Sequence, residues 1–293
     1  MTRPSASAYA IRLLAGLLDD AAVFPPGNAS LSAAVTAHRR HRKAWYRDIV
    51  GPLVIPASAM SALGPLLVDG EPLAVAVTLP QGPDGIADVL DAAATLPVQL
   101  VSLEVAVPAG ATGAELVAVL DARLTGTAVE VFVEVPRDER RDSLLAALAG
   151  RYRAKFRTGG IRAELYPDEA ELAAAVQAAV AAGVPFKATA GLHHAVRNTD
   201  PQTGFEQHGF LNLLLAAATV LEPAAARDRV ETVLAQRDAA VLAGRIRELG
   251  AQRLAAARAR FGSFGTCAIT EPLDELVTLG VLSSLPDREG ASA

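Results

Sequence analysis

The chain has little of what disulfide-linked, nucleic-acid-binding or membrane proteins need. It contains a single cysteine, Cys267, which excludes an intrachain disulfide framework and fits a reducing compartment. Acidic residues outnumber basic ones for a net charge of -5, whereas a nucleic-acid-binding domain is expected to be basic. The longest apolar run, residues 209–221, is too short to span a bilayer and is interrupted by Asn212. With no convincing signal peptide, we expect a cytoplasmic protein without nucleic-acid or membrane partners.

What the chain has in abundance is apolar sequence arranged in short alternating segments. Hydrophobic residues make up 51% of the 293 residues, enough for a large core. Eight strand-like runs, mostly apolar and ending at proline or glycine, alternate with helical segments. They cover residues 21–25, 49–56, 73–80, 98–107, 128–136, 154–159, 185–191 and 261–269. Eight such units predict an α/β fold of the (β/α)8 barrel type, for which about 250 residues is usual; a doubly wound open sheet is the alternative.

One interval breaks the strand–helix rhythm. Residues 209–260 have helical patterns throughout, which predicts a helical insertion before the last strand. The insertion can pack on the barrel, act as a lid, or form a contact between copies of the chain. We otherwise expect one domain over residues 1–285, followed by a loose tail at 286–293.

Polar residues, most of them charged, occur at the ends of four consecutive predicted strands. These are Glu104, Glu134, Lys155 with Arg157, and Lys187 with Thr189. Barrel enzymes carry their catalytic groups at the carboxyl ends of strands, and residues i and i+2 of a strand share a face. We therefore predict that these side chains meet inside the barrel, with Lys155, Lys187, Glu134 and Glu104 catalytic. An ion-pair network that only fills the interior is the alternative.

A buried lysine suggests a specific chemistry. Its amine becomes nucleophilic when burial or a neighbouring cation depresses its pKa, and a glutamate can then move protons. The glycines that follow the two lysine strands let backbone amides approach an anionic group. The predicted substrate-binding residues are Arg157, Thr158, Gly159, Gly160, Thr189, His193, His194, Arg197, His208 and Asn212.

The two lysine segments resemble those of a known family. Residues 155–159 read KFRTG and residues 187–191 read KATAG. Class I aldolases of the deoxyribose-phosphate aldolase type carry Lys-x-x-Thr-Gly on the sixth barrel strand and Lys-Ala-Ser-Gly-Gly on the seventh. The resemblance implies that Lys155 forms a Schiff base and that Lys187 lowers its pKa, in a lyase acting on a small anionic carbonyl compound. Arg157 stands where that family has a small hydroxyl residue, which favours an anionic substrate.

Two other kinds of function fit the same residues. The cationic cluster can stabilise an enolate without covalent chemistry, in an isomerase, lyase or hydrolase that is assisted by a metal or works without one. Alternatively, the barrel binds an anionic metabolite without turnover. The spacing of His193, His194 and His208 matches no standard metal motif, so we expect no cofactor, although a metal held by these histidines and a glutamate is the alternative.

Near the ends of the chain, several residues receive other predictions. If residues 21–25 form the first strand, Asp19 and Asp20 lie at its opposite end, away from catalysis. Asn28 or Ser30 then caps the following helix, or Asn28 points to the site. Residues 38–43 are predicted on a solvated helix face, Ser263 near an anion pocket, and Cys267 in inert core.

Overall fold

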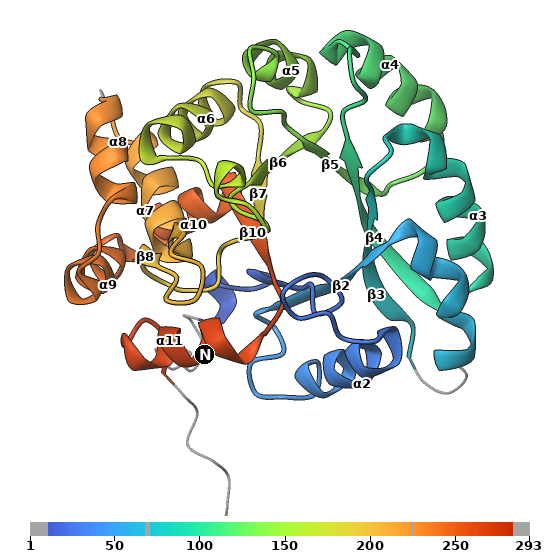
Figure 1. The fold of residues 1–293 in the computed structure, drawn as a ribbon, viewed down its shortest axis with the longest axis horizontal. Helices are drawn as coiled ribbons and strands as arrows, with labels where there is room; N and C mark the ends of the chain where they lie inside the picture. Colours follow the sequence, from blue (N-terminus) through green and yellow to red (C-terminus); the bar gives the residue numbers. More distant parts are fainter. Residues whose placement is uncertain (1–10, 68–70, 224–225, 284–293) are drawn as a thin grey trace, which may run out of the picture.

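Eight parallel strands close into a barrel, which confirms the predicted (β/α)8 fold (Figure 1). The computed structural model describes residues 11–67, 71–223 and 226–283. Around the barrel each strand pairs with the next one along the chain, and the last strand, β10, closes the ring between β7 and β1. The barrel strands are β1 (Leu18–Asp20), β2 (Val50–Pro56), β3 (Leu73–Leu79), β4 (Val98–Ala106), β5 (Glu130–Glu134), β6 (Arg153–Arg157), β7 (Phe186–Thr189) and β10 (Phe261–Thr266).

Helices surround this barrel and cover its outer face (Figure 1). The α-helices are α2 (Leu31–His41), α3 (Ile86–Thr95), α4 (Gly113–Arg123), α5 (Arg141–Leu148), α6 (Glu169–Ala181), α7 (Phe210–Val220), α8 (Arg227–Leu234), α9 (Ala239–Glu248), α10 (Gly250–Arg260) and α11 (Thr270–Thr278). Short 3-10 turns are η1 (Ala57–Ala62), η2 (Gly64–Leu66), η3 (Pro83–Gly85) and η4 (Ala163–Leu165), and a small antiparallel pair is formed by β8 (Asn198–Thr199) and β9 (Glu206–Gln207). None of the described helices is long and apolar enough to cross a membrane.

The first strand lies earlier in the chain than we predicted. It covers Leu18–Asp20, and the segment expected to be a strand, residues 21–25, is instead a turn in which the amide of Phe24 donates to the carbonyl of Ala21. Prolines at 25 and 26 cannot continue a parallel ladder because they donate no backbone hydrogen bond. The shift puts Asp19 and Asp20 at the carboxyl end of β1, the opposite of the sequence expectation.

The first helix after β1 shows one confirmed and one wrong prediction. Ser30 caps α2, and its hydroxyl accepts from the amide of Ala33 at 3.3 Å. His38 does not lie on a solvated face: it is 1% exposed, and its Nδ1 is 3.0 Å from Oδ2 of Asp20. The buried positions of α2 recur at helical spacing, so His38 falls on the face that packs against the barrel. Lys43 is exposed, as expected.

The predicted helical insertion before the last strand is present and consists of α7 to α10. Residues 210–219 of α7 are all buried, because this helix packs against β10, α6, α8 and α10. Figure 1 shows α7 to α10 gathered on one side of the barrel, beyond α6. The predicted tail, residues 286–293, lies outside the described residues.

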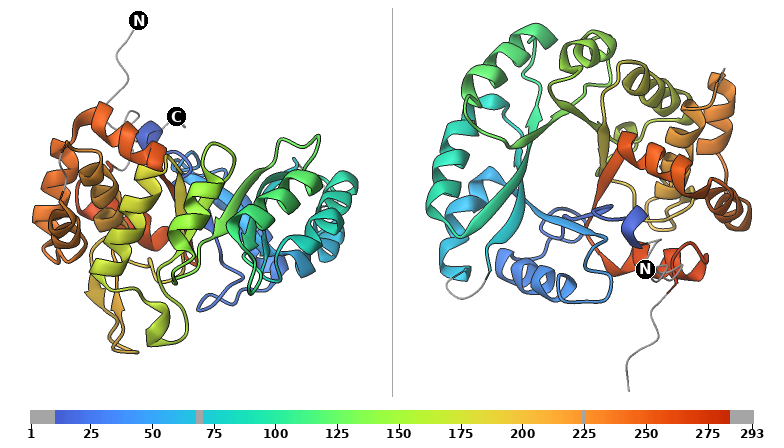
Figure 2. Two further views of the ribbon diagram at one scale, coloured as in Figure 1. Left: turned by 90° about the horizontal axis from the view of Figure 1, so that it is seen from above. Right: turned by 180° about the vertical axis from the view of Figure 1, so that it is seen from behind.

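One end of the barrel carries the longer connections. The β8–β9 hairpin and the loop with η4 project from the same end (Figure 2). These segments follow β7 and β6, so this is the end to which the carboxyl ends of the strands point. We call it the mouth of the barrel. Active sites of (β/α)8 enzymes lie at this end.

Candidate active site

Strand register brings the predicted catalytic residues together. Lys155 of β6 stands opposite Lys187 of β7, and Glu134 of β5 stands opposite Lys155. Side chains alternate between the two faces of a strand, so all three enter the barrel. Glu104 of β4 lies one step deeper, opposite Phe132. The structure therefore brings together all four residues that the sequence singled out as catalytic.

The side chains form one continuous chain of charge pairs. Nζ of Lys155 lies 3.0 Å from Oε2 of Glu104 and 2.9 Å from Oε2 of Glu134. Glu134 also accepts from Nε of Arg157 at 2.8 Å. Nζ of Lys187 lies 2.5 Å from the other oxygen of Glu104. Glu104 thus joins the two lysines, and Glu134 joins Lys155 to Arg157. We call these residues, together with Asp19, the charge chain.

Asp19 is the functional candidate that sequence reasoning missed. Its Oδ2 lies 2.5 Å from Nζ of Lys187 and accepts from the hydroxyl of Ser263 at 2.7 Å. The aspartate fits only because β2 has glycine at position 51, where a Cβ would collide with its Oδ1. Because the first strand was predicted at residues 21–25, Asp19 was expected at the end of that strand away from the site. The available signal was the Pro25–Pro26 pair, which argues against a strand there.

The chain of charges runs from the barrel centre to its mouth. The side chains of Glu104 and Lys187 are each 2% exposed, and that of Lys155 is 6% exposed. Glu134 and Arg157 reach 23% and 35%. The ring of Phe132 lies beside the deep end, with its centroid 5.2 Å from Nζ of Lys187. Exposure therefore falls from Arg157 and Glu134 to Lys155, and again to Glu104 and Lys187.

Burial and the neighbouring charges shift the pKa values of this chain. Burial alone raises the pKa of Glu104, but the ammonium groups of Lys155 and Lys187 outweigh it and lower the pKa to about 2. The pKa of Glu134 is likewise lowered, because Lys155 and Arg157 outweigh its burial. Burial prevails at Asp19, whose pKa is raised. The pKa of Lys187 is raised, because Asp19 and Glu104 outweigh the effect of burial.

These charges change the expectation that one lysine lowers the pKa of the other. The expectation rests on two lysines and an arginine close together, with the glutamates acting only in proton transfer. In the barrel, three carboxylates alternate with the three cations, so each cation is screened from the next by an acid. The interior ion-pair network that we gave as the alternative is therefore present. A network of this kind does not by itself exclude catalysis, since ionisable groups with shifted pKa values gather at active sites.

The loops that follow β6 and β7 pack directly on each other. The Thr158 hydroxyl donates to the carbonyl of Ala190 at 2.6 Å. A Cβ at Gly159 would lie 2.7 Å from the Cα of Gly191, and Gly191 has a φ of +72°. The two glycines are therefore required for the close approach of the loops. Their predicted contact with an anionic group remains a prediction, as does that of Gly160. Thr189 lies at the end of β7, opposite Arg157.

The three histidines predicted near the site have separate partners. His194 pairs through Nδ1 with Glu275 at 2.7 Å. The Nδ1 of His193 is 3.8 Å from Sγ of Cys267, which is half-buried and whose pKa burial raises. His208 is fully buried elsewhere. Within the described residues, no group of three or more histidine, cysteine or acidic side chains is arranged to hold a metal ion.

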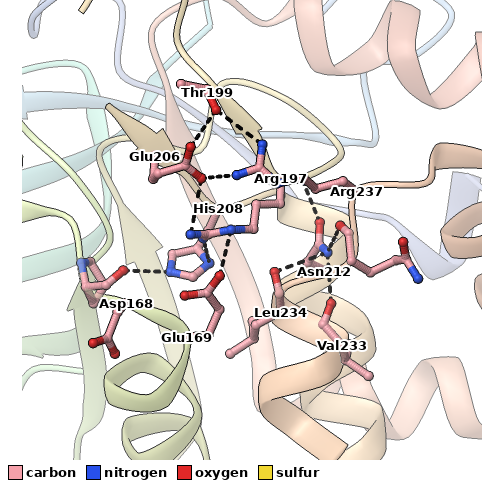
Figure 3. Close-up of polar contacts among 12 residues, drawn as sticks. Asp168, Glu169, Arg197, Thr199, Glu206, His208, Asn212, Val233, Leu234 and Arg237 are labelled. Carbon is pink, nitrogen blue, oxygen red and sulfur yellow. Dashed lines mark hydrogen bonds and ion pairs between the residues drawn. The ribbon is translucent and has the colours of Figure 1, made fainter. Parts of the chain in front are cut away.

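Arg197, His208 and Asn212 hold the loop after β7 in place (Figure 3). Nε2 of His208 donates to the carbonyl of Pro167 at 2.8 Å, so its Nδ1 accepts from Arg197 at 3.2 Å. Burial and the Arg197 charge lower the pKa of His208 to about 4, which leaves it neutral at pH 7. Arg197 also pairs with Glu169 at the start of α6, at 2.8 Å.

Asn212 completes this support from α7. Its side-chain oxygen accepts from the amide of Arg197 at 2.9 Å, and its amide donates to the carbonyls of Val233 and Gln236. Arg197, His208 and Asn212 are all buried among protein groups. These three residues support the loop near the site. The substrate contact that we predicted for them stays a prediction.

Comparison with known proteins identifies no family for this chain. No protein-family model matches the chain, and no curated protein sequence matches it significantly. The fold and the site therefore define the protein as a (β/α)8 barrel with a lysine–carboxylate chain that runs from its interior to its mouth.

Proposed function

We propose that this protein is a lyase of the aldolase type, in which Lys155 forms a Schiff base with a small anionic carbonyl compound. The observation that carries the proposal is the position of the Lys155 amine. It lies between two carboxylates, 3.0 Å from Glu104 and 2.9 Å from Glu134, at the point where the buried part of the charge chain meets the mouth. A reactive amine needs both access for the carbonyl and nearby groups that move protons. Lys187 is less exposed and is held by two carboxylates at 2.5 Å.

Glu134 is the proposed proton acceptor. It contacts Lys155 and is partly exposed, so it can take the proton from the ammonium and hold it for the loss of water that follows. In the empty site Arg157 shares the Glu134 carboxylate and lowers its pKa. When Arg157 turns to an anionic group of the substrate, Glu134 loses that cation and becomes more basic. Binding of the correct anion thus prepares the base that Lys155 needs.

The covalent step then follows ordinary imine chemistry. The neutral Lys155 amine adds to the carbonyl carbon, and one proton of the amine moves to the oxygen to give the carbinolamine. The protonated Glu134 then gives its proton to the carbinolamine hydroxyl, which leaves as water. The resulting iminium is positively charged beside Glu104, whose lowered pKa keeps it ionised. Glu134, again a carboxylate, takes the proton of the hydroxyl on the carbon that leaves, and that carbon becomes a carbonyl. The iminium accepts the electron pair of the carbon–carbon bond that breaks and becomes an enamine. Asp19 and Glu104 keep Lys187 charged, and that charge in turn keeps Glu104 in place.

Reductive trapping tests the proposal. The chain has only three lysines, Lys43, Lys155 and Lys187, and Lys43 is exposed. We expect cyanoborohydride to fix one equivalent of pyruvate or glyceraldehyde 3-phosphate on the wild-type protein, as measured by intact mass. Lys155→Met should abolish the adduct, whereas Lys43→Met should leave it unchanged. No adduct on the wild type with either probe would refute the Schiff base.

A second function has an observation of its own. All three cations of the charge chain contact carboxylates, and the pKa of Lys187 is raised, so its charge is held firmly. A fixed cation stabilises a developing enolate without forming a bond. In that non-covalent reaction Glu134 removes a proton next to the carbonyl. Exchange of solvent deuterium into the methyl group of pyruvate, in the absence of any trapped adduct, would favour this second function.

A further inference from the structure

A cleft opens beside the mouth of the barrel, and of the charge chain only Arg157 lines it. It lies between the loop after β5 and helix α6, and it has a volume of about 340 Å³, at the small end of the range for small-molecule sites. The lining includes the last two residues of β6, Phe156 and Arg157, so the cleft belongs to the same end of the barrel as the charge chain. Its apolar lining residues are Val135, Pro136, Phe156, Pro167, Leu172 and Ala175.

Arg157 belongs to both the cleft and the charge chain. Its Nε donates to Glu134 inside the barrel, and its side chain also lines the cleft. Among the described residues, Glu134 is the only hydrogen-bond or ion-pair partner of this guanidinium. Both terminal amino groups are therefore free to donate. A guanidinium that presents two parallel donors is suited to a carboxylate.

The acids of the lining leave the terminal amino groups of Arg157 available to an anion. Three lining acids are already paired with arginines, namely Asp138 with Arg140, Asp142 with Arg141 and Glu171 with Arg137. Glu139, the other lining carboxylate, is exposed at the rim. Beyond Arg157 the floor is apolar, and Phe156 and Leu172 are buried. A ligand with one carboxylate and an apolar group matches this arrangement.

The spacing of the reactive groups suits a carbonyl next to that carboxylate. Lys155 and Arg157 contact the two oxygens of a single carboxylate, that of Glu134, at 2.9 and 2.8 Å. The two cations are therefore one carboxyl group apart. A 2-oxo acid, whose carbonyl carbon adjoins its carboxylate, can reach both.

We propose that the cleft is a substrate subsite that takes the apolar substituent of a 2-oxo acid, whose carboxylate binds Arg157 and whose carbonyl reaches Lys155. The carbonyl part rests on the proposed function. Binding of the carboxylate and of the apolar group needs no covalent step, so it can be measured on unreactive acids.

Calorimetry with three unreactive probes tests the subsite. The probes are 3-phenylpropanoate, propanoate, which lacks the ring, and 3-phenylpropan-1-ol, which lacks the carboxylate. We expect 3-phenylpropanoate to bind the wild-type protein about tenfold more tightly than either of the others, because propanoate lacks the ring that is buried and the alcohol lacks the carboxylate that pairs with Arg157. Arg157→Gln should weaken both acids and leave the alcohol unchanged.

A filled cleft provides the decisive variant. Ala175 lines the cleft from α6, and Ala175→Leu should weaken 3-phenylpropanoate about fivefold or more while leaving propanoate unchanged, because only the ring needs the space. Ala170, exposed on the same helix and outside the cleft, gives the matched control Ala170→Leu, which should change neither. Thermal unfolding of each variant checks that it is folded.

The outcomes separate this subsite from the Schiff base. If Ala175→Leu and the wild type bind 3-phenylpropanoate equally, or if that acid binds no more tightly than propanoate, the subsite is refuted, whatever carbonyl trapping shows. If the acids bind as expected and no carbonyl adduct is trapped, the subsite is supported and the Schiff base is refuted.

Discussion

Lys155 and Lys187 stand opposite each other on β6 and β7, and their ammonium groups contact the two oxygens of one carboxylate, that of Glu104. This relationship places a single acid between two buried cations. Removing the acid leaves both lysines in a low-dielectric interior with one fewer partner, whereas removing either lysine leaves the acid with the other. Glu104 is therefore the residue on which the geometry of the site depends most.

Glu104→Gln should destabilise the fold strongly. Breaking a buried ion pair by removing one partner costs about 3–5 kcal/mol, and here it leaves the three cations of the charge chain with two carboxylates. We expect a loss of that order in the free energy of unfolding, measured by urea denaturation. The matched control is Glu130→Gln, which removes a partly exposed pair with Arg153 and should cost about 1 kcal/mol or less. Equal effects of the two variants would show that Glu104 does not balance the lysines.

His208 should make the fold sensitive to mild acid. Its pKa is lowered from 6.5 to about 4 by burial and by Arg197, so the unfolded chain binds a proton in a range where the folded protein does not. The contribution of neutral His208 to the free energy of unfolding is present above pH 6.5 and is lost as the pH falls towards 4. At pH 5 the loss is about 2 kcal/mol relative to pH 7. His208→Gln, which keeps a donor towards Pro167, should flatten this part of the profile of unfolding free energy against pH; an unchanged profile would contradict the assignment.

Gly51→Ala should disturb the deep end of the charge chain without removing a charge. A Cβ at this position collides with Oδ1 of Asp19, so the carboxylate whose other oxygen contacts Lys187 must shift. We expect a loss of about 1–3 kcal/mol in unfolding free energy, as for other overpacked cores, and weaker carbonyl trapping. The control is Gly244→Ala in α9, where a Cβ meets nothing within 4 Å and alanine favours the helix by about 0.5–1 kcal/mol. If both variants raised the stability, Asp19 would not be held against β2 as described.

The sequence predicted the barrel and most of the charge chain because both follow from local pattern. Glu104, Glu134, Lys155 and Lys187 each lie in an apolar strand-like run, and closure of a parallel barrel brings their inward faces together. No information about distant contacts was needed. The period of two along each strand was enough to predict which residues share a face.

Asp19 was missed because a three-residue strand is too short to show a period. The longer apolar segment at residues 21–25 competed with it, and the prolines that disqualify that segment come at its end. The supporting roles of Arg197, His208 and Asn212 could not be predicted from the sequence either. They depend on contacts with α6 and with residues 233–236, and such contacts are set by tertiary packing that leaves no local signal.

The central claim is that Lys155, not Lys187, reacts with the carbonyl, and peptide mapping of the reduced adduct tests it most directly. A reduced adduct blocks tryptic cleavage after the modified lysine, and the three lysines of the chain lie in different peptides. We expect the mass of the bound pyruvate or glyceraldehyde 3-phosphate on the peptide that contains Lys155, with cleavage after Lys187 intact. The label on Lys187 or on exposed Lys43 would contradict the account.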